Sequence, residues 1–359
     1  MAASPLPLAI VIPARNEAAV IGGTIECLRR HMESGDVIVV IDDGSNDGTG
    51  EIAERGGAKV VRRSDPLPCS RSERGRTGVG AGKSSALKFL LQSASTELDH
   101  YAAVVILDAD TKVDAGFLAC IRSRFAAGAQ AVQGFIVPVG DRRSAFGALS
   151  ACSALLEQKI DDRLRAALGW PVRLRGTGMA FRPDVFRAAA PQLRTHVEDV
   201  ELSIVLALRG VRVVFAPEAI IFDPAPENTA LAANQRARWL RGQWDVWRLY
   251  WREILALSLR GPWAWSLLGS LLFKPKSLIA AANMFLLGIS LAFPQLRVFS
   301  ALLALSLFAD AAYFLLGLAL VEMPGRRLRR LFSAPAYLAL WLRSVAVALR
   351  SSQVWLRAR

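Results

Sequence analysis

The hydrophobic pattern of the first hundred residues alternates short β-branched runs with segments of helical periodicity. The β-branched runs cover residues 8–12, 36–41, 58–62 and 103–107, each bounded by Gly, Asp, Pro or Arg. The helical segments cover residues 16–33, 46–56 and 83–95. Continuous apolar strands alternating with helices are typical of a parallel sheet covered on both faces. The pattern therefore predicts an α/β domain that binds its ligand at the carboxyl ends of the strands.

A second half of this domain follows a polar segment. Residues 64–82 are rich in Gly, Ser, Pro and Arg, which predicts a surface loop. Further strands are expected near 131–139, 178–182 and 211–215, and helices from about Glu198 to Arg209 and from Asn228 or Thr229 onward.

The pattern changes towards the end of the chain. Six of the nine Trp residues lie between positions 239 and 265, interleaved with Arg, as in helices at a membrane interface. Residues 277–293 and 298–321 are long apolar runs, separated by a short segment with Pro294 and Arg297. The first run is barely long enough to span a bilayer and the second is comfortably so. The alternative is a pair of buried core helices.

Basic residues on both outer flanks of these runs predict a hairpin whose two ends are cytoplasmic. They are Lys274, Lys276, Arg326, Arg327, Arg329 and Arg330. Residues 331–349 contain Pro335 and Arg343, so this segment is either an interfacial helix or a third span. The predicted domains are a cytosolic catalytic domain (1–240), interfacial helices (241–276), a transmembrane hairpin (277–322) and a basic interfacial or third membrane helix (323–359).

Composition supports the membrane prediction and leaves the partner open. Hydrophobic residues make up 53% of the chain and the mean hydropathy is +0.31, with the excess after about residue 263. The net charge of +13 fits nucleic acid, anionic lipid or a phosphorylated substrate. The apolar tail and the acidic strand ends argue against nucleic acid. The four cysteines are widely spaced and the N-terminus lacks a signal-peptide pattern, so a reduced cytosolic compartment is expected for the first part.

Acidic residues stand where two of the predicted strands end. Asp108 and Asp110 follow the strand 103–107, and residues two apart on an extended chain project to one side. Such a site suits Mg²⁺ or Mn²⁺ bridging phosphate oxygens, although solvated turn acids are the alternative. Asp42 and Asp43 open the segment DDGSNDGT, in which Ser45 or Asn46 is expected to cap the next helix. A carboxylate there can accept hydrogen bonds from a nucleoside, whereas Asp47 has an even chance of forming a structural turn.

Two motifs of the second half complete the candidate chemistry. Glu198 and Asp199 open a predicted helix, where they either complement the helix dipole or supply a general base. Gln235, Arg238 and Trp239 share one helix face, which suits a diphosphate beside a sugar or base. For Arg241, Trp244, Trp247 and Arg248 we expect membrane anchoring instead.

Lys83 stands in Gly82-Lys83-Ser84, which resembles the end of a phosphate-binding P-loop. The full pattern requires Gly at position 77, where this chain has Thr77. A lysine that opens a helix near a phosphate remains a reasonable expectation.

In this order the motifs resemble those of membrane-associated family 2 glycosyltransferases with the GT-A fold, over roughly residues 8–250. The resemblance implies that Pro13, Arg15, Glu17 and Asp42 or Asp43 line the nucleoside pocket, that Asp108 contacts the nucleotide and that Asp110 holds the metal. It also implies that Asp199 is the base and that Gln235, Arg238 and Trp239 form the QxxRW motif. Arg175, Gly176, Thr177 and Gly178 lie where members hold the acceptor-facing loop. Val197 departs from the family, which has Thr or Ser before Glu198-Asp199.

QxxRW is typical of cellulose, hyaluronan and chitin synthases and occurs in ceramide glucosyltransferase-like enzymes. This chain has fewer predicted spans than the processive synthases. The resemblance therefore implies an inverting, metal-dependent transferase that moves a sugar, most simply from a UDP-sugar, to a membrane lipid or lipid-linked acceptor. It would be a multi-pass protein of the inner or cytoplasmic membrane with its catalytic domain in the cytoplasm. A processive polysaccharide synthase is the alternative activity, and a catalytically silent membrane scaffold with the same fold is the rival from another class.

Overall fold

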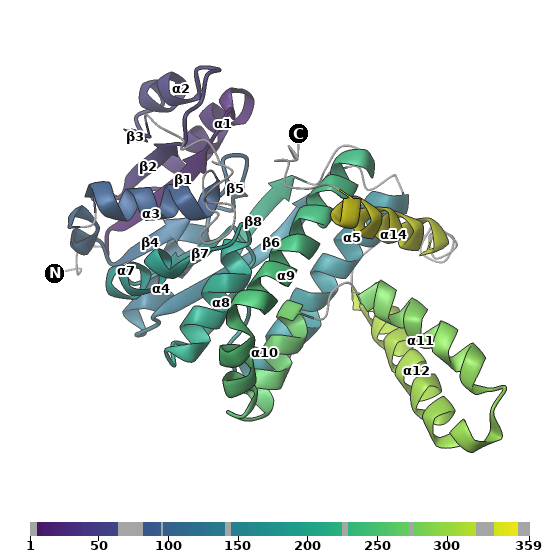
Figure 1. The fold of residues 1–359 in the computed structure, drawn as a ribbon. Coiled ribbons are helices and arrows are strands. Elements are labelled where there is room, and N and C mark those ends of the chain that lie inside the picture. Colours follow the sequence, from purple (N-terminus) through teal and green to yellow (C-terminus); the bar gives the residue numbers. More distant parts are fainter. Residues whose placement is uncertain are drawn as a thin grey trace. The chain divides into compact units, whose positions relative to one another are not determined.

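A computed structural model describes residues 6–63, 82–94, 96–140, 145–224, 229–272, 276–320 and 334–350 (Figure 1). The chain divides into two compact units whose segments alternate along the sequence. The first unit comprises residues 1–137, 162–224 and 242–267, and the second comprises 138–161, 225–241 and 268–359. The domain boundaries expected at residues 240, 276 and 322 remain predictions.

The first unit is built on an eight-stranded sheet. Its strands are β1 (Leu8–Ala14), β2 (Val37–Asp42), β3 (Lys59–Arg62), β4 (Ala103–Ile106), β5 (Lys112–Val113), β6 (Ala131–Val139), β7 (Met179–Phe181) and β8 (Val213–Pro224). Their order is β3-β2-β1-β4-β7-β6-β8-β5. The seven strands expected from the sequence are confirmed, and the two-residue strand β5 was not foreseen.

The sheet is mixed, which corrects the expectation of a mostly parallel one. Strands β3, β2, β1 and β4 run parallel. Strand β7 is antiparallel to both β4 and β6, and β5 is antiparallel to β8. Helices join each of these four strands to the next one along the chain, as parallel neighbours require. The parallel half therefore brings the ends of β1, β2 and β4 to one edge.

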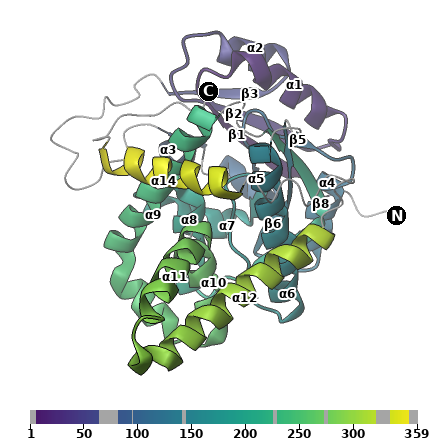
Figure 2. The ribbon, with the colours of Figure 1, turned by 90° about the vertical axis from the view of Figure 1, so that its right-hand side faces the viewer.

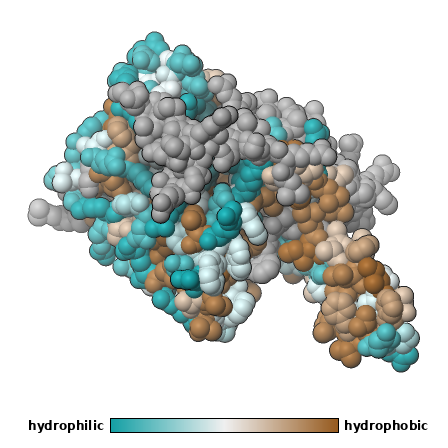
Figure 3. All heavy atoms as spheres, viewed as in Figure 1, coloured by the Kyte–Doolittle hydropathy of each residue, from teal (hydrophilic) through white to brown (hydrophobic). Residues whose placement is uncertain are grey.

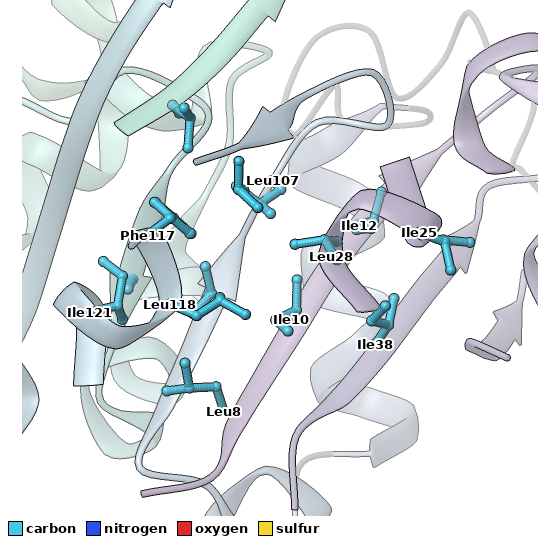
Figure 4. Packing of buried hydrophobic residues seen from close by; sticks show 14 of the residues in the cluster. Leu8, Ile10, Ile12, Ile25, Leu28, Ile38, Leu107, Phe117, Leu118 and Ile121 are labelled. Carbon is cyan, nitrogen blue, oxygen red and sulfur yellow. The ribbon is translucent and has the colours of Figure 1, made fainter. Parts of the chain in front are cut away.

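The main hydrophobic core lies between the sheet and two helices, α1 (Ala18–Arg29) and α4 (Phe117–Ala126). Alternate residues of β1, Leu8, Ile10 and Ile12, point towards these helices and are fully buried (Figure 4). Side chains two apart lie on one face of a strand, so the intervening residues face the other layer. There α3 (Lys83–Ala94) packs on β1 and β2, and α7 (Pro183–Ala189) packs on β4.

Shorter helices and the buried helix α8 complete the first unit. Their bounds are α2 (Thr49–Arg55), η2 (Glu97–His100), α6 (Arg163–Ala167), η4 (Ala190–Gln192) and α8 (Glu198–Leu208). The predicted helices at 16–33, 46–56, 83–95 and 198–209 are confirmed with shorter ends. The expected cap of α2 is wrong, because the N-cap residue is Gly48, whose φ of 88° favours glycine, and not Ser45 or Asn46.

Helix α9 (Thr229–Ser258) contributes residues to both units and contains one non-helical residue, Tyr250. The helix begins at Thr229, so its cap position falls on Asn228, which lies outside the described residues, and the predicted cap remains a prediction. The remaining helices are α5 (Ala145–Leu156), the π-helical turn Glu157–Asp162, α10 (Pro262–Leu272), α11 (Lys276–Ser290), η5 (Pro294–Leu296), α12 (Arg297–Leu320) and α14 (Ala334–Arg350).

Helices α11 and α12 form an antiparallel hairpin within the second unit (Figure 2). Within the described residues, one segment, Pro294–Leu316, is long and apolar enough to cross a membrane, and its residues are almost entirely unburied. Helix α11 has 15 residues, or about 22 Å, against a hydrocarbon core of about 30 Å. Thus one of the two expected spans has the required length.

Helix α14 has a buried and an exposed face. Leu340, Trp341 and Ser344 are buried, whereas Leu342 and Arg343 are exposed. Its apolar part, Leu338–Ala348, is shorter than a span. The choice between the two expectations for this segment, an interfacial helix and a third span, remains a prediction. Of the predicted flanking charges, Lys274 and the four arginines lie outside the described residues.

Candidate active site

The turns after β1 and β2 are bonded to each other at the carboxyl edge of the sheet. The Asn16 amide donates to Ser45 Oγ (3.0 Å), and the Asn46 amide donates back to Asn16 Oδ1 (3.0 Å). The Glu17 amide donates to Thr49 Oγ1 (2.8 Å). Asn16 has a φ of 58°, a left-handed conformation that asparagine tolerates better than most residues. Asn16 thus joins the two predicted nucleoside motifs, although only Pro13, Arg15 and Glu17 were expected to act in its segment.

The two aspartates after β2 are both buried and hold neighbouring turns. Asp42 Oδ1 accepts from the Ser45 amide (2.9 Å). Asp43 forms a buried ion pair with Arg63 (2.9 Å) and accepts from the Gly82 amide (3.0 Å). Because Gly82 directly precedes α3, Asp43 fixes the start of the helix that carries Lys83.

Asp47 has the structural role that was one of its two expected roles. Its carboxylate accepts from the Ala18 amide (3.1 Å), the Thr49 amide (3.1 Å) and the Thr49 hydroxyl (2.5 Å). It therefore ties the start of α1 to the start of α2.

Lys83 contacts residues of the motif predicted for the donor and of the motifs predicted for the acceptor. Its Nζ donates to Asp108 Oδ1 (2.6 Å) and to the Gly176 carbonyl (2.5 Å), and it lies 3.4 Å from Glu198 Oε1. These partners come from the end of β4, the loop before β7 and the first turn of α8. One ammonium group thereby connects three segments that lie far apart in the sequence.

The carboxylates around Lys83 alter the protonation of this cluster. Burial alone would lower the pKa of Lys83, but Asp108 and Glu198 outweigh it and raise the pKa, so the ammonium is charged. Burial raises the pKa of Glu198 to about 7, against the opposing effect of Lys83 and with help from the charges of Asp199 and Asp108. Glu198 therefore binds its proton more tightly than an ordinary glutamate.

The loop expected to face the acceptor is held rigidly by buried polar groups. Thr177 Oγ1 accepts from the Asp108 amide (3.1 Å), and the Thr177 carbonyl accepts from Gln133 Nε2 (3.0 Å). Gly176 and Gly178 have φ values of 87° and 65°. A side chain at Gly178 would also lie 2.4 Å from Ile221. Both glycines are therefore needed for the loop to approach Lys83 and β8.

Arg175 holds the loop that contains Gly176 and Thr177 through its own buried contacts. Its guanidinium binds the fully buried carboxylate of Asp162, which also accepts from Arg165 Nη1 (3.1 Å). The Arg175 amide donates to Gln133 Oε1 (2.9 Å). No sequence motif marks Gln133 or Asp162, because the role of each depends on contacts between distant segments.

Helix α8 places Glu198 and Asp199 in its first turn, as predicted. The N-cap residue Val197 makes no side-chain capping bond. The backbone before the helix is instead held by Glu201, which accepts from the Arg194 and Thr195 amides. Glu198 is buried beside Lys83, whereas Asp199 is partly exposed. Of the two acids, Asp199 is the more accessible to an acceptor.

The acids after β4 lie in a turn, which corrects the argument from strand geometry. Strand β4 ends at Ile106, and the Thr111 amide donates to the Asp108 carbonyl (3.1 Å). The two-residue alternation of an extended strand therefore does not set the directions of Asp108 and Asp110. Thr111 and Thr177 share a hydrogen bond (3.0 Å) that closes this turn against the Gly176 loop.

Asp223, near the end of β8, is a further acid of this site that the sequence did not reveal. Burial raises its pKa to about 7, as does the charge of Asp108, while Lys83 opposes the shift. The only signal in the sequence is an acid between the apolar strand residues and Pro224. The sequence does not show that β8 pairs with the sheet, so it does not show that Asp223 lies at the carboxyl edge.

The donor atoms at this edge fit a hard divalent cation. Mg²⁺ and Mn²⁺ prefer oxygen ligands, which Asp108 and Asp110 offer. In the part of the chain that the structure describes, no three His, Cys, Asp or Glu side chains come close enough to form a metal site by themselves.

The QxxRW segment is helical, as predicted, and belongs to the second unit. Gln235 and Arg238 are partly exposed and Trp239 is exposed. Within the motif, the Arg236 guanidinium lies over the Trp341 ring of α14 at 4.9 Å. The functions expected of Gln235, Arg238 and Trp239 remain predictions.

Arg241, for which membrane anchoring was expected, is hydrogen-bonded to helix α14. Its Nε and Nη2 donate to the Ala348 and Val347 carbonyls (2.8 and 2.9 Å) near the end of α14. Arg241 thus caps a helix terminus, and its membrane anchoring remains a prediction.

Comparison with known proteins decides the family. Residues 103–323 match the model of the glycosyl transferase family group 2, and residues 9–186 match that of glycosyl transferase family 2. The chain belongs to the family 2 glycosyltransferases.

Two known proteins are similar to this glycosyltransferase. The beta-monoglucosyldiacylglycerol synthase of Synechocystis sp. is 29% identical over 269 residues, which cover 70% of this chain and 50% of the relative. The chain thus spans about half the length of that curated relative. The mannosyltransferase PcManGT of Pyrobaculum calidifontis, solved with GDP-Man and Mn²⁺, is 16% identical and has a TM-score of 0.55. The likeness covers 98% of this chain and 89% of that one, which supports the GT-A fold.

Proposed function

We propose that this glycosyltransferase moves a sugar from a nucleotide sugar to a membrane lipid or lipid-linked acceptor with inversion at the anomeric carbon. The observation that carries the proposal is the Lys83 cluster, in which one ammonium binds Asp108 of the donor side and contacts Glu198 of the acceptor side. A sugar donor and an acceptor hydroxyl must meet at such a junction. The β-linked product in the name of the Synechocystis relative is what inversion of an α-linked nucleotide sugar gives.

The chain's own groups divide the work of the reaction. Asp199, partly exposed in the first turn of α8, takes the proton of the acceptor hydroxyl as that oxygen attacks the anomeric carbon. Lys83 neutralises the charge that develops on the departing diphosphate. The Asn16, Ser45 and Thr49 network keeps the turns of the nucleoside pocket together.

A divalent cation completes the donor site in this proposal. Asp110, with Asp108 beside it, would hold Mg²⁺ or Mn²⁺ against the donor phosphates. The cation would supply positive charge that stabilises the leaving diphosphate. The mannosyltransferase with the similar fold was solved with Mn²⁺ and GDP-Man, which supports a metal here without choosing between the two.

Membrane attachment through the second unit supports a lipid acceptor. The outer faces of the α11–α12 hairpin are apolar, with Phe285 70% and Phe308 72% exposed (Figure 3). Between the helices, Asn283 bonds Ser306 (3.1 Å) and Ser290 bonds Ser300 (2.8 Å). Apolar outside and polar inside is the reverse of a water-soluble helix pair. The hairpin therefore fits lipid, and we assign the protein to the cytoplasmic membrane with the catalytic unit in the cytoplasm.

In the first unit, α9 carries a stripe of exposed tryptophans beside arginines. Trp244, Trp247 and Trp251 are 61%, 44% and 49% exposed, and the Arg252 guanidinium lies 5.1 Å from the Trp251 ring. Tryptophan and arginine together favour the headgroup layer of an anionic bilayer. Such a surface would bring the catalytic unit to membrane-borne acceptors.

Purified protein in detergent tests the proposal. UDP release is measured with a panel of UDP-sugars, diacylglycerol or membrane lipid extract, and Mg²⁺ or Mn²⁺. We expect lipid-dependent release with one donor, lost in Asp110→Ala, and a product with the size of a glycolipid. A long polymer as the product would establish the processive synthase instead.

Asp199→Asn tests the assignment of the base. The amide cannot accept the hydroxyl proton, so transfer should fall at least about 10³-fold while UDP still binds in the presence of Mn²⁺. The matched control is Asp184→Asn, an exposed aspartate paired with Arg182. Transfer retained in Asp199→Asn would refute the assignment.

A further inference from the structure

A second carboxylate of α8, that of Glu201, is completely buried two residues after Asp199. Its Oε1 accepts from the Arg194 amide (2.8 Å) and the Tyr250 hydroxyl (2.7 Å). Its Oε2 accepts from the Thr195 amide and the Thr195 hydroxyl (2.8 Å each). The side chain thus reaches back from the helix to the loop that leads into it.

These contacts define what Glu201 does in the site. An ionised carboxylate offers about four lone-pair positions, and four donors from three residues occupy them here. Glu201 is therefore bound to the loop and not aimed at a substrate. Asp199, by contrast, is partly exposed in the same helical turn.

The same loop is fixed from two other sides. The Ser84 hydroxyl donates to the Thr195 carbonyl (2.6 Å), which links the loop to the helix turn that bears Lys83. Val197 packs against Gly242 of α9 so closely that a Cβ at Gly242 would lie 2.3 Å from Val197 Cγ1. The loop before Asp199 is thus enclosed between α3, α8 and α9.

Tyr250 is the non-helical residue inside α9, with φ −119° and ψ 17°. Its ring is buried, and its hydroxyl reaches both Glu201 and the Gln192 carbonyl (3.3 Å). Burial raises the pKa of Tyr250, and the Glu201 carboxylate raises it further, so the phenol keeps the proton it donates. The break in α9 lies where this hydrogen bond is made.

We propose that Glu201 and Tyr250 are a positioning pair. Through it, helix α9 fixes the position of the loop 194–197 and, with the loop, the position of Asp199. Trp247 and Trp251, which are exposed, flank Tyr250 on the same helix, so the pair joins the tryptophan stripe to the acceptor side of the site. The inference rests on the proposed function only for the role of Asp199 as the base.

Hydrogen exchange tests the pair without any substrate. The amides of Arg194 and Thr195 donate to Glu201, and Tyr250→Phe removes one of the hydrogen bonds that hold the Glu201 carboxylate in place. We therefore expect these two amides to exchange at least about tenfold faster in Tyr250→Phe. The effect should be larger in Glu201→Gln. The matched control is Tyr101→Phe, the same change at a residue just before the start of β4. It should leave the exchange rates of the Arg194 and Thr195 amides unchanged. Unchanged exchange in both Tyr250→Phe and Glu201→Gln would overturn the proposal.

Kinetics separate positioning from general loss of structure. With UDP-glucose and diacylglycerol, kcat should fall about tenfold in Tyr250→Phe and roughly a hundredfold in Glu201→Gln, while UDP affinity measured with Mn²⁺ stays within about twofold. An equal loss of UDP binding would show a structural role and contradict the proposal. Asp199→Asn should lose transfer with normal exchange at 194–195. If no donor supports transfer, the proposed function fails and the exchange data still decide the positioning role.

Discussion

At Lys83, one side chain has two neighbouring carboxylates and a backbone carbonyl as partners. The sequence placed this lysine at a helix start near a phosphate, and α3 does begin there. Its partners Glu198 and Gly176 lie about a hundred residues away and share no motif with it. Glu198 pairs with the ammonium only weakly, at 3.4 Å, and is buried, so its negative charge is poorly compensated.

Glu198 should make the metal-free protein less stable as the pH rises. Its pKa is about 7 in the fold against 4.5 in the unfolded chain, so the folded state binds more protons between these values. Stability then falls with rising pH through that window, by an amount on the order of 3 kcal/mol. Glu198→Gln removes this dependence.

Melting temperatures with a chelator present provide the measurement. The quantity compared is the melting temperature of Glu198→Gln minus that of the unmodified protein. This difference should be several degrees larger at pH 8 than at pH 5. Parallel curves for the two proteins over this range would contradict the raised pKa. Glu51→Gln, an exposed glutamate of α2, serves as the control.

At the scale of elements, α9 serves two kinds of packing along one helix. Arg236 and Arg241 contact α14 in the second unit. Gly242 and Tyr250 contact the loop before Asp199 in the first unit. Val197, which stands where the family has Thr or Ser, is buried, and its methyl groups fill the space that Gly242 leaves.

Gly242→Ala should destabilise the protein even though alanine is the better helix former by about 1 kcal/mol. The new Cβ would overlap both Val197 methyl groups, and such overpacking costs about 1–3 kcal/mol. Apparent melting temperature in detergent is the measurement. Gly269→Ala in α10, where a Cβ meets nothing within 4 Å, is the matched control and should be neutral or stabilising.

A second substitution distinguishes local overlap from other causes. Adding Val197→Ala to Gly242→Ala should restore part of the lost stability, because the smaller side chain makes room for the new methyl group. If the losses of stability in the double variant were purely additive, Gly242 and Val197 would not be energetically coupled.

At the scale of the whole molecule, the exposed apolar surface is concentrated in the hairpin of the second unit. Val298, Phe299, Leu302 and Leu305 of α12 are all exposed, with Val298 at 77%. Soluble monomers rarely expose apolar patches of this extent. Because α12 is about 36 Å long and α11 about 22 Å, we expect α12 to cross the bilayer and α11 to accompany it over part of the depth.

Charges on the outer face of α12 should release the protein from membranes. A charged residue near the centre of a span costs about 3 kcal/mol, so Leu305→Glu with Phe308→Glu should weaken insertion strongly. The measurement is the fraction that stays in the membrane pellet after an alkaline carbonate wash. The control is Leu164→Glu, an exposed apolar position in α6, which should keep the unmodified distribution. Release of the unmodified protein by salt alone would refute insertion.

Seven of the eight strands, the order of the motifs and the family resemblance could be predicted from the sequence. Apolar runs of residues such as Leu8–Ile12 leave no alternative to a buried strand, and turn acids such as Asp42 and Asp108 follow directly from where those strands end. Helix starts at Lys83 and Glu198 were predictable for the same reason. These features depend on neighbours within a few positions along the chain.

Only the tertiary structure decided which groups work together. The mixed pairing of β7, the closing of the Lys83 cluster and the burial of Glu201 under Tyr250 all join residues separated by tens of positions or more. Asp223 became a site residue because β8 pairs at the carboxyl edge, and Arg241 became a helix cap because α14 lies against it. Local sequence determines the elements through side-chain periodicity, whereas protonation and hydrogen-bond partners are set by the low-dielectric surroundings that packing creates.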